Sequence, residues 1–232
     1  GLGDVYKRQL SIYINDTDQD TALAVWLIQN YKLFEGVQSI PTINRLLALN
    51  DRLDITGGSF PMNLDDTLVH QYCWVFEPYT NLRKSGALAV ANQQVLRDNL
   101  DATLKRISDH MMGKGGESVP DTRHTILYDS PRFKIVEETG GSSARTFLFN
   151  HGMTAFISLV ATRPDGKNVW SIGRLSQYVD FPVLQLYKAY NEAEGLKQDE
   201  GWGGSDIVGG SSRLHGSVLS WEQLRDITNK FL

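Results

Sequence analysis

The stretch Gly113–Asp121, GKGGESVPD, divides the sequence into two halves of different character. It is polar and rich in glycine and proline, a composition typical of a linker rather than of a helix or strand. Helix-like patterns precede it, and short strand-like runs follow it. We therefore expect an α/β fold of two lobes, with an N-terminal lobe over residues 10–116 and a C-terminal lobe over residues 121–232.

The N-terminal half is predicted to be mainly helical, with one short strand. The apolar run Ile12–Ile14 is of strand type, and Ala22–Ile28 reads as a buried helix because it is apolar nearly all round. A second helix should begin at Pro41, since proline suits the first helical turn. Further along, apolar side chains recur every three or four residues and predict one helical stripe, formed by Leu96, Leu100, Leu104, Ile107 and Met111.

The C-terminal half is predicted to form a mixed sheet with helices against it. Short strand-like runs are found at Thr125–Tyr128, Lys134–Glu137 and Thr146–Phe149. Two longer runs, 156–161 and 168–172, flank an Asp165-Gly166 pair that predicts a hairpin turn. Val183–Glu194 reads as a helix, and a final helix should start at Ser220, where Ser-Trp-Glu-Gln resembles a capping box.

Composition restricts the classes of function. The chain of 232 residues is 41% hydrophobic, enough for a substantial core, and its formal charge of −4 argues against non-specific binding of duplex nucleic acid. The single Cys73 excludes an internal disulfide and a cysteine-based zinc cluster. No apolar run approaches the roughly 20 residues that span a bilayer, and no signal peptide is visible, so we expect a cytoplasmic protein without a membrane partner.

The first nine residues differ from the rest of the chain. GLGDVYKRQ, residues 1–9, has no helical or strand period and resembles the translated remnant of a sequencing adapter at the end of an environmental-DNA reading frame. We therefore expect these residues to be an artefact, and the chain to be a metagenomic fragment whose true N-terminal part is missing.

Three carboxylates follow the first predicted strand in a D-x-D-x-D run, formed by Asp16, Asp18 and Asp20. Mg²⁺ and Mn²⁺ prefer oxygen ligands, so the run predicts a metal site in which Asp18 and Asp20 also take part in catalysis. The alternative is that one aspartate caps the following helix and the others add favourable first-turn charge. Asp54 either completes the metal site or bonds its own backbone in a solvated turn.

The glycine-rich stretch after residue 200 is the second candidate site. Backbone N–H groups freed by glycine can cradle an anion, Arg213 can pair with it bidentately, and Arg174 can point at the same pocket. The alternative is a mobile surface loop or a β-bulge. The predicted substrate-binding residues are Arg174, Gly203, Gly204, Gly209, Gly210, Ser211, Ser212, Arg213 and His215.

From the predicted hairpin to the C-terminus, the sequence resembles the substrate-binding domain of DHH-type phosphoesterases. VWSIGRLS, the Val183–Glu194 helix, GWGGSDIVGGSSR, GSVLS and the last helix follow that domain's order. The GGGH signature of the family is absent, and two Gly-Gly pairs with Arg213 stand in its place.

The first half is similar to the same family in two alternative ways. NDTDQD resembles the family's H-x-D-x-D motif with Asp16 in place of histidine, which implies metal binding by Asp16, Asp18 and Asp20. LDITGGSF instead resembles its later Asp-Thr-Gly motif, which makes Asp54 a metal ligand and places the absent Asp-His-His triplet upstream. The resemblance implies a hydrolase that uses Mn²⁺ or Mg²⁺ on a small phosphate ester or short nucleotide. The alternative function is a non-catalytic anion-binding or regulatory protein.

Overall fold

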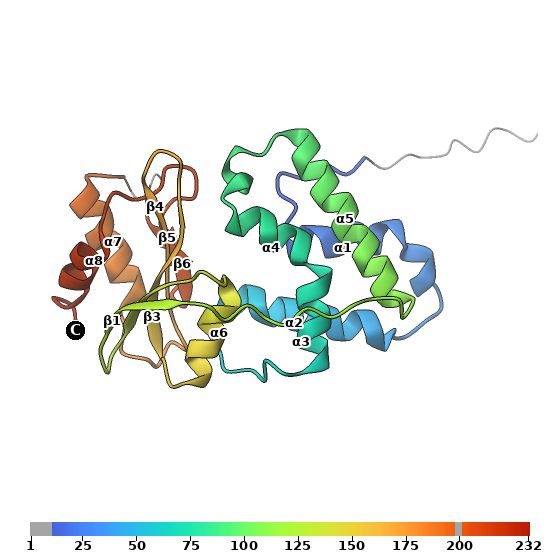
Figure 1. The fold of residues 1–232 in the computed structure, drawn as a ribbon, viewed down its shortest axis with the longest axis horizontal. Coiled ribbons are helices and arrows are strands. Elements are labelled where there is room, and N and C mark those ends of the chain that lie inside the picture. Colours follow the sequence, from blue (N-terminus) through green and yellow to red (C-terminus); the bar gives the residue numbers. More distant parts are fainter. Residues whose placement is uncertain (1–10, 198–200) are drawn as a thin grey trace, which may run out of the picture.

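The computed structural model describes residues 11–197 and 201–232, and they form a helical lobe beside a lobe built on a mixed sheet (Figure 1). The expected α/β class is therefore confirmed. Residues 1–9, expected to be an artefact, lie outside the described residues. Within the described part of the chain, no helix is both long and apolar enough to cross a membrane.

The helical lobe comes first in the chain. Its elements are α1 (Gln19–Gln29), η1 (Tyr31–Phe34), α2 (Pro41–Thr56), α3 (Thr67–Val75), α4 (Glu77–Lys84), η2 (Ala87–Val90) and α5 (Gln93–Met111). Helices α1, α3 and α5 begin at side chains that cap the first turn, Asp18, Asp66 and Asn92. The core of this lobe includes Leu23, Trp26, Ile43 and Phe76, and the predicted stripe of α5 contributes Ile107 to it.

The second lobe contains a six-stranded sheet in the order β1-β2-β3-β4-β6-β5. Its strands are β1 (Thr125–Asp129), β2 (Lys134–Glu137), β3 (Ala155–Thr162), β4 (Asn168–Arg174), β5 (Gly203–Gly204) and β6 (Val208–Gly210). Among the described strands, only β2 and β3 pair in parallel, and α6 (Ser142–Asn150) connects them. The predicted hairpin around Asp165-Gly166 is confirmed as β3 and β4, which pair antiparallel.

Helices cover both faces of the sheet. Ile157 and Ile172 point to one face, where they pack against α7 (Val183–Glu194) and α8 (Trp221–Thr228). Phe156 points to the other face and packs against α6. The predicted limits of α7 and the capping box at Ser220 are confirmed. Figure 1 shows that α6 lies between the sheet and the helical lobe.

Two predicted strands are wrong. Ile12–Ile14 forms no strand and is exposed, because no other described strand lies beside it to pair with its backbone groups. Thr146–Phe149 belongs to α6. The physical reason is that two parallel neighbouring strands require a long crossover, usually a helix, and α6 is the crossover from β2 to β3.

The two lobes meet at the turn that follows α2. Gly57 ends α2 in the left-handed conformation, and a Cβ atom there would lie 2.7 Å from a methyl carbon of Val208 in β6. Thr146 of α6 donates to the carbonyl of Gly58 at 3.2 Å. Further along, the Asn150 amide exchanges two hydrogen bonds of 2.8 Å with the backbone of Met62. Helix α6 therefore provides the hydrogen bonds that join the two lobes at this turn and the segment after it.

Candidate functional site

A pocket of about 240 Å³ lies between the helical lobe and the carboxyl ends of β2 and β3. The helical lobe lines it with Gln19, Tyr79, Thr80, Arg83 and Lys84, and the other lobe with residues from 137–142 and 159–162. In open α/β sheets, ligands bind at the carboxyl ends of parallel strands, where the crossover helix begins. This pocket occupies that position in the β2–α6–β3 unit.

The loop from β2 into α6 forms one wall of the pocket. Gly141 precedes α6 with a φ of 80°, and no side chain in the described part of the chain caps the first turn of this helix. Gly141 and Ser142 both line the pocket, so the N-terminal end of α6 borders it. Backbone N–H groups at a helix N-terminus carry partial positive charge and favour an anion. The preceding Gly140 allows close packing, since a Cβ there would lie 2.1 Å from the carbonyl oxygen of Asp121.

Two cationic side chains of α4 face this loop. Lys84 Nζ lies 3.0 Å from Asp121 Oδ2, but Asp121 also receives hydrogen bonds from Arg123, and these hold the pKa of its carboxyl well below the ordinary value. Among the described residues, no ion pair joins the guanidinium of Arg83 to a carboxylate. Burial lowers the pKa of Arg83, and the charges of Arg213 and Arg145 lower it further. The charge of Glu138 has the opposite effect, and Glu137 and Glu138 line the pocket together with the two cations.

Sequence reasoning missed the buried pair that supports this wall. Arg145 of α6 donates to both carboxylate oxygens of Glu138, at 2.7 and 2.9 Å, and its guanidinium stacks 4.3 Å from the ring centre of Phe156. Glu138 also lines the pocket. The signal was present as the Gly140–Ser143 run, Gly-Gly-Ser-Ser, which begins three residues after the end of a predicted strand, but the predicted strand Thr146–Phe149 concealed the helix that follows it.

Two of the predicted metal ligands lie near the pocket. Asp18 caps α1, its Oδ1 accepting from the backbone N–H of Thr21 at 3.0 Å. Burial raises the pKa of Tyr79, a pocket residue, and the negative charges of Asp16 and Asp18 add to this effect. The positive charge of Arg213 lowers the pKa of the same hydroxyl. None of Asp16, Asp18 and Arg213 is among the residues that line the pocket.

The other two predicted metal ligands form a pair. Burial raises the pKa of Asp20, and the charge of Asp54 raises it further. Asn50 donates to Asp20 Oδ1, and Tyr72 in turn donates to Asn50 Oδ1 at 2.8 Å. Both residues are exposed, Asp20 near the start of α1 and Asp54 near the end of α2, so the burial that acts on the Asp20 carboxyl is only partial. The structure thus brings Asp54 beside the D-x-D-x-D run.

These carboxylates do not fit a resident Mn²⁺ or Mg²⁺ ion as they stand. Nowhere in the described part of the chain do three His, Cys, Asp or Glu side chains gather as a group that could hold a metal. Asp18 serves as a helix cap, and Asp20 accepts from Asn50. We therefore derive no metal-dependent step.

The glycine-rich stretch is folded into strands. Gly203 and Gly204 form β5, and Gly209 and Gly210 belong to β6, which pairs with β4. A Cβ at Gly210 would lie 2.1 Å from the carbonyl oxygen of Trp170, so glycine is needed here for close strand packing. The hydroxyls next to these strands accept backbone hydrogen bonds, Ser211 from Trp170 and Ser212 from His215, and the His215 side chain is exposed.

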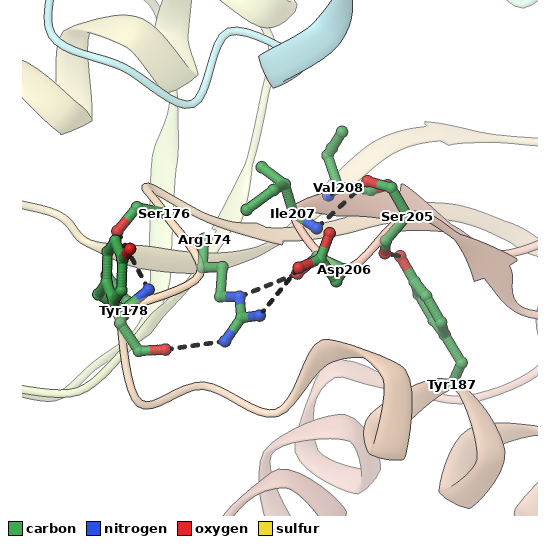
Figure 2. A network of polar contacts seen from close by, with 9 residues as sticks. Arg174, Ser176, Tyr178, Tyr187, Ser205, Asp206, Ile207 and Val208 are labelled. Atoms are coloured by element: carbon green, nitrogen blue, oxygen red, sulfur yellow. Dashed lines mark hydrogen bonds and ion pairs between the residues drawn. The ribbon is translucent and has the colours of Figure 1, made fainter.

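Arg174 lies at the end of β4 and holds the turn between β5 and β6 (Figure 2). Its Nε donates to the carbonyl of Asp206 at 2.9 Å, and its Nη1 to the carbonyl of Val179 at 3.0 Å. Ser205 Oγ accepts from the backbone N–H groups of Ile207 and Val208 in the same turn. Arg174 is not among the residues that line the pocket.

No protein-family model, curated protein or solved structure matches this chain.

Proposed function

We propose that the chain binds a small phosphorylated molecule in the pocket between its two lobes. The observation that carries this proposal is the meeting of Arg83, Lys84 and the N-terminus of α6 in one cavity at the carboxyl ends of β2 and β3. Positive groups that are removed from water and lack full compensation are unfavourable by themselves. Lys84 is paired with Asp121 and Glu138 with Arg145, whereas Arg83 has no ion-pair partner among the described residues. A phosphate group would pair with Arg83 and accept further hydrogen bonds from Lys84 and the N-terminus of α6.

The remaining walls suit the organic part of such a ligand. Tyr79 and Leu159 offer apolar surface, while Gln19 and Thr80 offer hydrogen-bonding groups. Sites for small molecules commonly combine apolar walls with a few polar groups that fix orientation. The pocket thus favours a phosphate ester of modest size over free inorganic phosphate.

Calorimetric titration with inorganic phosphate tests the anion site directly. We expect saturable binding that weakens about tenfold or more in Arg83→Met and in Lys84→Met, because each variant loses a charge-assisted hydrogen bond. Arg97→Gln is the matched control, since Arg97 is exposed on α5 and lies outside the pocket. Equal phosphate affinity in all four proteins, or no binding by the parent chain, would overturn the proposal.

Hydrolysis of the bound phosphate ester is the second candidate function. It is favoured by the position of the D-x-D-x-D run, whose Asp18 caps α1 directly before the pocket residue Gln19. Its test is the release of nitrophenol from p-nitrophenyl phosphate, with and without added Mn²⁺, for the parent chain and Asp16→Asn. Turnover that needs Mn²⁺ and is lost in the variant supports a phosphoesterase. Phosphate binding without turnover supports the non-catalytic alternative.

A further inference from the structure

We infer that the ligand of the pocket carries a positively charged amino group in addition to its phosphate group, and that Glu137 receives this amino group. The inference rests on the proposed function and specifies its ligand class as the phosphate ester of a small primary amine. The phosphate group would lie at Arg83, Lys84 and the N-terminus of α6, and the amino group at the end of β2.

The pocket combines charges of both signs. Four of the residues that line it carry a formal charge, and they are Arg83, Lys84, Glu137 and Glu138. Two of these charges are compensated within the protein, because Lys84 pairs with Asp121 at 3.0 Å and Glu138 accepts two hydrogen bonds from Arg145. Among the described residues, no ion pair includes Arg83 or Glu137. The pocket therefore presents one cation and one anion without a partner of opposite charge.

The cationic end of the pocket lies where α4 meets the start of α6. Arg83 and Lys84 are neighbours in the last turn of α4. A Cβ atom at Gly141, the residue before α6, would lie 3.1 Å from Cε of Lys84. The side chain of Lys84 is therefore packed against the N-terminal end of α6, which is the position proposed for the phosphate group.

Glu137 borders the pocket from the end of β2. Successive side chains of a strand point to opposite faces, and Glu138 points toward α6, where Arg145 holds its carboxylate. Glu137 therefore points to the other face, beside Leu159, its partner on β3 and also a pocket residue. Glu137 is exposed and lies beyond ion-pair distance of Arg83. Its carboxylate is thus available to a ligand that extends along Leu159 from the cationic end.

A ligand with only a phosphate group would match half of this arrangement. It would compensate Arg83, but its charge would repel the carboxylate of Glu137. Covering that carboxylate without giving it a partner would also remove water from a charged group at a cost. An ammonium group on the ligand reverses the sign of the interaction and donates hydrogen bonds to the carboxylate. A short carbon chain between the two groups would contact Leu159 and Tyr79, which supply the apolar walls.

Calorimetry with two matched ligands tests the inference. They are O-phosphoethanolamine and propyl phosphate, in which a methyl group replaces the ammonium group. We expect the parent chain to bind O-phosphoethanolamine about fivefold or more tightly than propyl phosphate, as a partly exposed ion pair allows. In Glu137→Gln this advantage should disappear, because the amide carries no charge, whereas the affinity for propyl phosphate should not weaken.

Two further variants make the comparison specific. Glu137→Asp should keep only part of the advantage, because it retains the charge on a shorter side chain. Glu192→Gln should retain all of it, since Glu192 is exposed on α7 and lies outside the pocket. Glu137 is itself exposed, so its substitution is not expected to unfold the protein.

The outcomes separate the inference from the proposed function. If propyl phosphate binds and Arg83→Met weakens it, but O-phosphoethanolamine gains nothing or its advantage survives in Glu137→Gln, the position of the amino group is wrong and the proposed function stands. If neither ligand binds, or if Arg83→Met leaves both affinities unchanged, the proposed function fails and the inference fails with it.

Discussion

Arg145 and Glu138 form a bidentate ion pair in the interior between the sheet and α6. The two nitrogen-to-oxygen distances are 2.7 and 2.9 Å, and each residue is only 4% exposed. The third nitrogen of the guanidinium donates to the carbonyl of Gly57 in the helical lobe, at 2.6 Å. One side chain therefore connects the pocket wall, helix α6 and the opposite lobe.

Breaking this pair should be costly. Arg145→Met leaves the carboxylate of Glu138 buried without a partner, and we expect the free energy of unfolding to fall by about 3–5 kcal/mol. Urea denaturation measures the change. The double variant Arg145→Met/Glu138→Leu removes both charges and should be less destabilised than the single variant. A loss below about 1 kcal/mol in the single variant would mean that the pair is effectively solvated.

Glycine at position 209 should be required for packing rather than for contact with an anion. A Cβ at Gly209 would lie 2.1 Å from the hydroxyl oxygen of Tyr187, whereas a Cβ at Gly203 would meet nothing within 4 Å. We expect Gly209→Ala to destabilise the protein by about 1–3 kcal/mol through overpacking. Gly203→Ala, the matched control, should change stability much less. Equal melting temperatures for the two variants would show that the atoms around Gly209 move to accommodate the added methyl group without loss of stability.

The elements that the sequence predicted correctly are those determined by residues close to them along the chain. The α7 helix, the Asp165-Gly166 hairpin and the capped start of α8 all follow from periodicity and turn chemistry. Thr146–Phe149 could not be assigned this way. Its β-prone residues form a helix because β2 and β3 pair in parallel, and that pairing joins strands that are separated in the sequence.

The candidate site was less predictable than the fold. Asp20 and Asp54 are adjacent only because α1 packs on α2, and neither helix reveals this alone. Arg83 and Lys84 resemble ordinary surface residues at the end of a helix. Their significance comes from the opposite lobe, which places the N-terminus of α6 beside them.

Acid should destabilise the helical lobe through His110. This side chain is 8% exposed, and its Nε2 has no hydrogen-bond partner among the described residues. Burial lowers its pKa, and the charge of Arg45 lowers it further. Below about pH 6.5, the unfolded chain therefore takes up a proton at this histidine more readily than the folded chain does. The free energy of unfolding consequently decreases as the pH is lowered.

Urea denaturation near pH 7.5 and pH 5.5 checks this prediction for the parent, His110→Leu and His215→Gln. The parent should lose stability at the lower pH, and His110→Leu should lose less than the parent. His215 is exposed, so His215→Gln should behave as the parent does. An identical loss in His110→Leu and the parent would assign the acid sensitivity to other groups.

The last prediction concerns the pair formed by Asp20 and Asp54. Partial burial raises the pKa of Asp20 above its ordinary value, and the charge of Asp54 adds to this. Asp54→Asn should therefore lower the pKa of Asp20, measured from the carboxyl carbon shift in an NMR titration. Asp51→Asn is the control, because Asp51 lies on the same helix but does not contribute to this shift.

A carboxyl group with a raised pKa binds protons more readily in the folded chain, so it favours folding in acid and opposes folding at neutral pH. Asp54→Asn should consequently gain stability at neutral pH relative to Asp51→Asn, and the gain should shrink as the pH falls through the titration of Asp20. An unchanged Asp20 titration in Asp54→Asn would show that the two carboxylates do not interact in solution. The gathering of Asp54 with the D-x-D-x-D run would then have no electrostatic consequence.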